Sequence, residues 1–436
     1  MSNLSADYEI RRFLAAPKDD PAYAESVAWM RAVHFGFHDE RRSDDRVDKS
    51  IELQRIDRRV MTGVYQTGNV AAHSLGADIP VATFGTMNKT LNIGFGRLLD
   101  TRLVTAVTVR TSHRRRGLLR RMMGEDLACA REQGIAMAAL TASEASIYGR
   151  FGFGVATSEQ SVKVETTARF RLNHTPVGSV EVADPKVLLE LAPEVFDRVH
   201  RATPGSIGRH EFYRQLASGS VTREGGEDPK VKVALHYGPD GGVDGYVSYK
   251  FAGWSSEPYT MEVVDLVAAT GPAYLELWQY LAAIDLVDRV TWEEAPVDDP
   301  LRWALEDARC VEASAARDML WLRILDVKQA LEARHYPAGG RLVLGVADAL
   351  GLTGGTFVLE AEAGSGVVTA AGDQTAALNT PDLELDISAL SALYLGGVSP
   401  VTLAASGRIL EHTPGAAFRA ARMFAVERPP HCLTHF

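Results

Sequence analysis

The stretch "VTAVTVRTSHRRRGLLRRMM", residues 104–123, decides the fold of this chain. Its first half runs apolar and predicts a strand. After Gly117 the apolar residues recur every three or four positions and predict a helix, which Gly134 is placed to end. Five arginines lie between residues 114 and 121, in a chain that is otherwise acidic. The stretch therefore predicts a strand that turns into a helix through a cluster of positive charge.

The start of this helix is a candidate anion site. Backbone N–H groups in the first turn of a helix have no internal partner and carry partial positive charge. Gly117 lets the backbone approach a phosphate closely, and Arg114 and Arg115 can bind a pyrophosphate from the side. The pattern favours a diphosphate-bearing cofactor. A solvated basic helix start is the alternative, and Arg120 and Arg121 are expected to be surface charges.

The flanking sequence predicts a mixed domain. A helix is expected over residues 26–38, and the acidic and arginine-rich segment Asp39–Arg59 is expected to be mobile and solvated. Four apolar stretches separated by Gly, Asn and Asp predict an antiparallel meander, at 60–66, 70–75, 80–91 and 102–110. After the arginine-rich helix, "IAMAAL" (135–140) predicts a short buried strand and "SEASIYGRFGF" (143–153) a turn of helix and a bend.

Two further blocks follow. Residues 180–325 repeat the order of elements, but their strand-to-helix step "LVAATGPAYLELW" (266–278) has no arginine and carries Pro272 at the first helical turn. This block is predicted to keep the scaffold without the anion site. From residue 326 onward, a helix, Gly-rich strands and two more helices predict an α+β domain.

Composition excludes several classes of protein. The net charge of −10 argues against nucleic acid as the main partner, because duplex binding needs a broad basic face. Cys129, Cys310 and Cys432 are odd in number and far apart, so neither a disulfide framework nor a metal site is indicated. The N-terminus has charges where a signal peptide needs an apolar run, and no segment approaches the ~20 apolar residues of a membrane span. A cytoplasmic location is expected.

Four pieces of sequence carry a resemblance to a known family. They are "HRRRGLL" (113–119), "SEASIYGRFGFG" (143–154), "DISALSALYLGG" (386–397) and the terminal Phe436. Together they resemble the enhanced intracellular survival (Eis) acetyltransferases of actinobacteria, within the GNAT superfamily. Arg114 and Gly117 match the acetyl-CoA signature of that superfamily, whereas Leu119 departs from its usual small residue.

The resemblance implies an α+β protein of three domains. Residues 1–165 would form a catalytic GNAT domain of mixed-sheet α/β type with the acetyl-CoA site. Residues 166–325 would form a second GNAT-like domain without a cofactor site. Residues 326–436 would form a sterol-carrier-protein-like α+β domain whose end reaches the active site.

The resemblance also implies site residues. Val107 and Val109 would offer backbone groups to the pantetheine arm of acetyl-CoA, although both also fit simple buried strand positions. Arg114, Arg115, Gly117 and Leu118 would hold its pyrophosphate.

Two further residues would carry the chemistry. Tyr148 would protonate the departing thiolate, with a core tyrosine as the alternative. The terminal carboxylate of Phe436, with an ordinary pKa of about 3.5, would act as the base, with a frayed terminus as the alternative.

The activity implied is acetyl-CoA-dependent N-acetylation of a polycationic small molecule, such as an aminoglycoside antibiotic, at one or more amines, by a homo-hexamer. Two alternatives stay open. The same chemistry would serve lysine side chains of peptides or proteins. A different class of protein, a lipid-binding carrier, would use only the third block.

Overall fold

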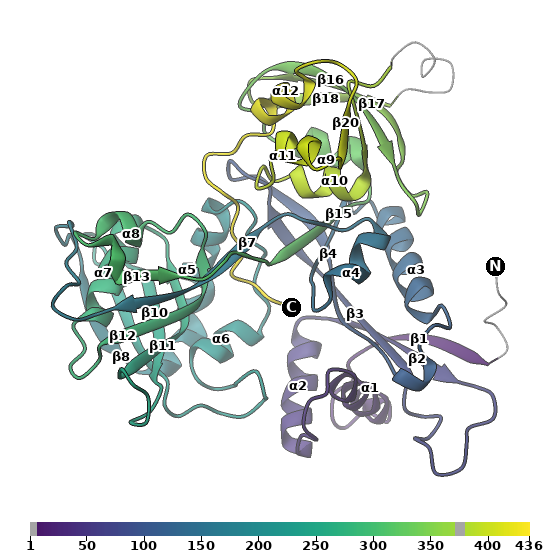
Figure 1. Cartoon of the computed structure of the whole chain (residues 1–436). Helices are drawn as coiled ribbons and strands as arrows, with labels where there is room; N and C mark the ends of the chain where they lie inside the picture. The colour runs from purple at the N-terminus through teal and green to yellow at the C-terminus, as the bar shows by residue number, and fades with distance from the viewer. Residues whose placement is uncertain (1–6, 371–379) are drawn as a thin grey trace.

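The computed structural model describes residues 7–370 and 380–436, which form three sheets with their helices (Figure 1). The first sheet has the order β1-β2-β3-β4-β5-β15-β6. Its strands are β1 (Tyr8–Leu14), β2 (Val60–Gln66), β3 (Ala82–Asn92), β4 (Leu98–Val109), β5 (Met137–Thr141), β6 (Gly154–Val155) and β15 (Leu320–Ile324). Its helices are α1 (Tyr23–Gly36), α2 (Asp44–Ile56), α3 (Leu118–Glu132) and α4 (Ala145–Tyr148).

Strands β4 and β5 separate along their length. They pair in parallel from Thr101 to Leu103 of β4, whereas β4 continues to Val109 along β3. The β3–β4 register shifts between Thr83 and Gly85, and Ala106 has a φ of 51°. This is a β-bulge, which bends a strand and turns its backbone groups. The far half of β4 thus keeps an edge that β5 does not cover.

Sequence predictions for this domain have a mixed outcome. The helix after Gly117 is confirmed as α3, and Gly134 follows its end with a φ of 79°. The prediction of a mobile segment at 39–59 is wrong, because α2 lies there and buries Val47 and Ile51 against Trp29. Two apolar residues four positions apart gave too weak a periodicity to predict it. The expected strand at 70–75 is also wrong, because that segment forms turns.

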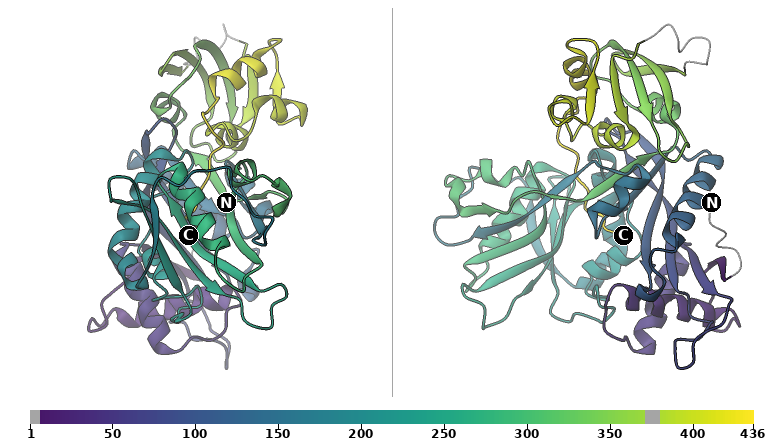
Figure 2. Two further views of the ribbon diagram at one scale, coloured as in Figure 1. Left: turned by 90° about the vertical axis from the view of Figure 1, so that its left-hand side faces the viewer. Right: turned by 45° about the vertical axis from the view of Figure 1, so that its right-hand side comes forward.

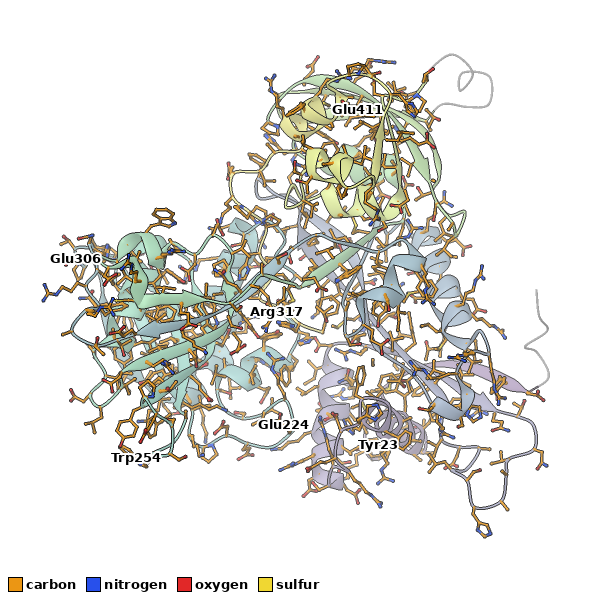
Figure 3. All side chains as sticks on the ribbon, in the orientation of Figure 1. Tyr23, Glu224, Trp254, Glu306, Arg317 and Glu411 are labelled. Atoms are coloured by element: carbon orange, nitrogen blue, oxygen red, sulfur yellow. The ribbon has the colours of Figure 1, made fainter. Side chains whose placement is uncertain are left out.

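The second sheet has the order β13-β7-β12-β11-β10-β9-β8, and β14 also pairs with β7. Its strands are β7 (Ser158–Glu165), β8 (Ser179–Ala183), β9 (Lys232–Tyr237), β10 (Val243–Phe251), β11 (Thr260–Ala268), β12 (Arg289–Pro296), β13 (Val311–Ala313) and β14 (Arg317–Asp318). Its helices are α5 (Leu188–Ala202), α6 (Phe212–Ala217), α7 (Gly271–Ala282) and α8 (Leu301–Ala304). Figure 3 shows Trp254 and Glu306 at the outer side of this domain and Arg317 on the side that faces the first.

The chain exchanges strands between the first two sheets. Strand β7, whose residues fall within the expected first domain, pairs with β12 in the second sheet. Strand β15, whose residues fall within the expected second domain, pairs with β5 and β6 in the first sheet. Leu320, Leu322 and Ile324 of β15 are fully buried. The pairing therefore divides the chain differently from the expected boundaries at 165 and 325, and ties the two domains together.

The third sheet has the order β18-β17-β16-β19-β20. Its strands are β16 (Gly340–Ala347), β17 (Gly355–Glu362), β18 (Ser365–Ala370), β19 (Leu383–Asp386) and β20 (Ile409–Glu411). Its helices are α9 (Val327–Ala333), α10 (Ile387–Leu393), α11 (Pro400–Ala405) and α12 (Ala416–Met423).

The third domain packs directly on the first sheet. A Cβ on Gly154 of β6 would lie 2.0 Å from the carbonyl oxygen of Ser388 in α10, so only glycine permits this approach. Arg323 of β15 forms an ion pair at 2.8 Å with Asp348, and both side chains are fully buried. Two of the quoted motifs, around Gly154 and Ser388, therefore meet at this domain junction.

After α12 the chain leaves the third domain. Figure 1 and the right view of Figure 2 show it running down between the other two domains to its end. The C-terminus thus lies at the centre of the molecule.

Candidate active site

The N-terminus of α3 presents unpaired backbone donors. Gly117, at the N-cap, has a φ of 77° and no side chain caps the helix. The Arg121 N–H donates to the Gly117 carbonyl at 3.0 Å. In an α-helix this is the first internal bond, so the N–H groups of Leu118 and Leu119 have no partner in the helix. An anion is the natural complement of this end.

The arginines of this turn divide into two groups. Arg116 donates to the Tyr8 hydroxyl at 2.6 Å and to the Ser112 carbonyl, and Arg121 pairs with Glu125 at 2.8 Å. Arg114 and Arg115 are exposed, and within residues 7–370 and 380–436 neither side chain forms a hydrogen bond or an ion pair. These two guanidinium groups are therefore free to bind a ligand beside the helix end.

Val107 and Val109 lie on the half of β4 that β5 does not cover. Both are half-buried and pack against the core cluster that contains Val104, Leu118 and Tyr148. Their side chains therefore pack as ordinary strand residues. The backbone of the same strand borders the gap between β4 and β5. A ligand with amide groups can pair with such an edge, as an added strand does.

In the second domain, the helix N-terminus that follows the equivalent strand is capped. The Thr270 hydroxyl accepts from the Ala273 N–H at 3.2 Å and caps α7, and Pro272 lies in its first turn. The same hydroxyl donates to Asp244 at 2.8 Å. A filled cap and a carboxylate oppose the binding of a phosphate there.

Tyr148 ends α4, just beyond β5. Its side chain is 6% exposed and its ring meets Phe153 edge to face. Burial raises the pKa of Tyr148, and a hydrogen bond with Ser143 offsets part of that rise. The hydroxyl therefore keeps its proton at neutral pH and can donate it.

The chain end is held in place residue by residue. Cys432 and Thr434 are fully buried. The His431 N–H donates to the Pro204 carbonyl, and the Thr434 hydroxyl donates to the Ile207 carbonyl, each at 2.8 Å. This pattern is that of a docked segment, which the alternative of a frayed terminus does not describe.

The terminal carboxylate reaches the first sheet. The His435 N–H donates to the Tyr213 hydroxyl at 2.6 Å. A carboxylate oxygen of Phe436 accepts from the Thr141 hydroxyl at 2.9 Å. Thr141 is the last residue of β5, and α4 with Tyr148 follows it. The structure therefore brings the terminal carboxylate to the same end of β5 that leads to Tyr148.

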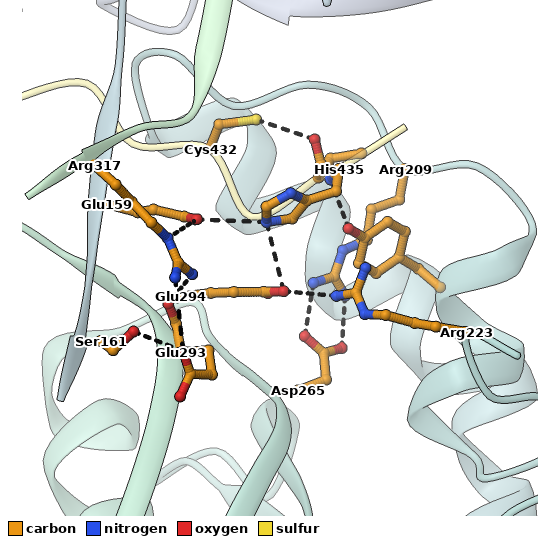
Figure 4. A network of polar contacts seen from close by, with 12 residues as sticks. Glu159, Ser161, Arg209, Arg223, Asp265, Glu293, Glu294, Arg317, Cys432 and His435 are labelled. Carbon is orange, nitrogen blue, oxygen red and sulfur yellow. Dashed lines mark hydrogen bonds and ion pairs between the residues drawn. The ribbon is translucent and has the colours of Figure 1, made fainter. Parts of the chain in front are cut away.

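Two buried glutamates hold the side chain of His435 (Figure 4). Its Nε2 lies 3.5 Å from Glu159 and 3.6 Å from Glu294. Glu159 also pairs with Arg317, and Glu294 with Arg223. Burial raises the pKa of Glu294, whereas for Glu159 His435 and Arg317 outweigh burial and lower the pKa. Sequence analysis did not predict these acids, because they come from separate strands, β7 and β12.

An open pocket of ≈ 360 Å³ lies in front of the chain end. Thr141, Phe436 and His435 form part of its lining. Charged residues from two domains complete it: Arg42, Asp57 and Arg59 from the first and Arg223 from the second. The domains meet there directly, because the Arg42 guanidinium donates to the Arg223 carbonyl at 3.1 Å.

Comparisons with known proteins agree with this architecture. Two models described as acetyltransferase (GNAT) domain match residues 23–156 and 205–324, and a sterol carrier protein domain matches residues 327–433. The crystal structure of Eis1 from Mycobacterium abscessus has a TM-score of 0.78, at 27% identity over 98% of this chain and 100% of that chain.

Sequence identity to known relatives shows the family of this chain. An uncharacterized N-acetyltransferase from Streptomyces avermitilis is 35% identical over 94% of this chain and 96% of the relative. The N-acetyltransferase Eis of Mycobacterium tuberculosis is 32% identical over 76% of this chain and 80% of the relative. This chain is an Eis-type GNAT N-acetyltransferase.

Membership of the Eis family confirms the predicted fold class of two GNAT domains followed by a sterol-carrier-like domain. GNAT acetyltransferases generally use acetyl-CoA, and the open end of α3 in this Eis-type enzyme fits its diphosphate. In the described part of the chain, no helix is long and apolar enough to cross a membrane.

Proposed function

We propose that this Eis-type enzyme transfers the acetyl group of acetyl-CoA to an amine of an acceptor bound in the pocket at the chain end. The observation that carries the proposal is the hydrogen bond from Thr141 to the terminal carboxylate of Phe436. It fixes a carboxylate at the end of β5, beside the gap in which the backbone of β4 is uncovered. A base placed there meets an amine that enters from the pocket.

The cofactor would be held along β4 and the start of α3. Arg114, Arg115 and the amides that follow Gly117 would bind its phosphates, and the backbone near Val107 and Val109 would pair with its pantetheine amides. Acetyl-CoA supplies an acetyl thioester. The second domain would bind none, because Thr270 closes the equivalent helix end.

The chain's own groups would move the protons. The amine nitrogen attacks the carbonyl carbon of the thioester, the C–N bond forms, and the C–S bond breaks with its electron pair on sulfur. The nitrogen gives one proton to the Phe436 carboxylate, directly or through a water, and the sulfur takes one from the Tyr148 hydroxyl. The proton on the carboxylate then passes through solvent to restore Tyr148.

The identity of the acceptor is a separate matter. The family resemblance predicts a polycation such as an aminoglycoside, or a polyamine, and the net charge of −10 attracts one. Lysine side chains of peptides are the alternative within the same chemistry. The homo-hexamer likewise stays a prediction, which sedimentation of the 47.4 kDa chain tests.

The lipid-carrier alternative finds less support. The third domain fills its interior with side chains such as Leu342, Leu359 and Leu390. The Arg334 guanidinium, also buried, donates to the carbonyls of Tyr394 and Phe424. An interior crossed by a hydrogen-bonded arginine suits a packed core better than a lipid tunnel.

A thiol-release assay with product mass tests the function. Purified protein, acetyl-CoA and a panel of amines should release free thiol and give products heavier by one or more acetyl groups. The panel contains aminoglycosides, polyamines, lysine peptides and small amino acids. Absence of thiol release with every amine would overturn the proposed function, and lipid recovered from the purified protein would favour the carrier.

A further inference from the structure

The charges that line the pocket at the chain end do not balance. Arg42 accounts for one positive charge and is paired with Asp39 at 3.2 Å, and Arg223 is paired with Glu294 at 2.8 Å. Asp57 is likewise engaged, because it accepts from Lys89 at 2.9 Å. Each of these charges thus has an opposite charge within contact distance.

Arg59 is the exception. Its Nη2 lies 3.8 Å from the sulfur of Met87, and its Nε is buried without a hydrogen-bond partner. Among the described residues, no carboxylate forms an ion pair with it. Burial lowers the pKa of Arg59 to about 10, which still leaves it charged at neutral pH. Arg59 is half-buried, and the nearby Asp57, whose charge raises the pKa of Arg59, already accepts from Lys89. A partly buried cation that has no carboxylate of its own favours an anionic ligand.

The terminal carboxylate is the second unpaired charge of the same lining. Phe436 accepts from the neutral Thr141 hydroxyl, and within residues 7–370 and 380–436 it forms no ion pair. Arg59 and the chain end thus present opposite charges to one pocket without neutralising each other. A ligand that carries both an amine and an anion can satisfy both groups at once.

We propose that the acceptor is a small amino carboxylate, whose carboxylate binds Arg59 while its amine faces the terminal carboxylate of Phe436. A guanidinium binds a carboxylate through two parallel hydrogen bonds, which a neutral or cationic acceptor cannot offer. The pocket volume of ≈ 360 Å³ suits a small molecule. Arg59 then determines specificity and takes no part in the proton transfers. This inference rests on the proposed function.

Matched acceptors test the inference. The ω-amino carboxylates from glycine to 6-aminohexanoate are compared with n-alkylamines of the same length, with spermidine and with kanamycin. One charge-assisted contact predicts that the best amino carboxylate exceeds its alkylamine in kcat/KM by roughly 10- to 150-fold. Equal values for each pair, or a preference for spermidine or kanamycin, would overturn the inference.

Variants connect the preference to the residue. Arg59→Gln should bring the kcat/KM of the amino carboxylate down to that of the matched alkylamine, while Arg59→Lys should keep part of the preference. Arg55→Gln, an exposed arginine of α2 that pairs with Glu52, is the matched control and should change neither. If the Arg59→Gln variant kept the preference for amino carboxylates, another residue would determine it and the inference would be wrong.

Thermal unfolding distinguishes a role of Arg59 in anion binding from a role in folding, and it does not depend on enzyme activity. Removing a half-buried charge that forms no ion pair should raise the Tm, so Arg59→Met should unfold at a higher temperature than the wild type. A lower Tm would make Arg59 a structural residue. A rise in the wild-type Tm with 4-aminobutyrate, lost in Arg59→Gln, would support the anion site even if no amine released thiol, and thus distinguishes it from the proposed function.

Discussion

Thr141→Val is the substitution that tests the position of the proposed base with least disturbance. Valine has the shape of threonine and favours a strand, so β5 should be kept. The change removes the hydroxyl that donates to the Phe436 carboxylate at 2.9 Å. A hydrogen bond to a charged group contributes roughly 1.5 to 3 kcal/mol, which corresponds to roughly 10- to 150-fold in rate.

The lower end of that range applies here. Thr141 is half-buried, so a water can replace part of the lost bond. We expect kcat to fall about 10-fold in steady-state assays, with the KM for acetyl-CoA unchanged. Loss of the donor also favours the protonated carboxylate, so the acid limb of the pH–rate profile should move to higher pH.

Thr141→Ser is the matched control, because it keeps the hydroxyl and should keep most of kcat. Two results would refute the reasoning: wild-type kcat in Thr141→Val, or an equal loss in the serine variant.

Three further predictions follow from other contacts. Arg115→Ala should raise the KM for acetyl-CoA roughly 10-fold or more and leave the KM for the amine unchanged; equal effects on both would count against the cofactor site. Because the pKa of Tyr148 is raised, no loss of kcat from its ionisation should occur below about pH 10, and Tyr148→Phe should lower kcat without weakening acetyl-CoA binding. Burial raises the pKa of Asp348, but the ion pair with Arg323 lowers it by more, so the pKa of Asp348 lies below its ordinary value. Its contribution to stability is thus full above about pH 4 and is lost as pH falls through the lowered pKa. Asp348→Asn should remove that pH dependence and cost about 3 to 5 kcal/mol at neutral pH, as measured by urea unfolding.

Local sequence predicted the helix at the proposed cofactor end of the site. The apolar period that begins after Gly117 is long, and α3 follows it from Leu118 to Glu132. The arginines of that turn are consecutive in sequence, so we could predict that they lie close together without knowing the tertiary fold. The helix at Asp44–Ile56 escaped prediction because charged residues surround its two buried apolar ones.

The acceptor end of the site depends on contacts that are distant in sequence. Thr141 and Phe436 are separated by 295 positions, and Arg59 by still more from the chain end. The exchange of β7 and β15 between sheets was hidden for the same reason, since each strand pairs with strands that are distant in sequence. Only the resemblance to a family pointed to the chain end, and the unpaired charge of Arg59 appears only when the pocket is assembled.

The terminal carboxylate as base is the central claim, and extending the chain tests it most directly. Two glycines added after Phe436 would place a neutral amide beside Thr141 and move the charge away. The account predicts that kcat falls by the roughly 10²- to 10⁴-fold typical of a lost general base, with acetyl-CoA binding intact by calorimetry. Phe436→Leu, which keeps the carboxylate, should cost much less. An extended enzyme with wild-type kcat would contradict the account and place the base elsewhere.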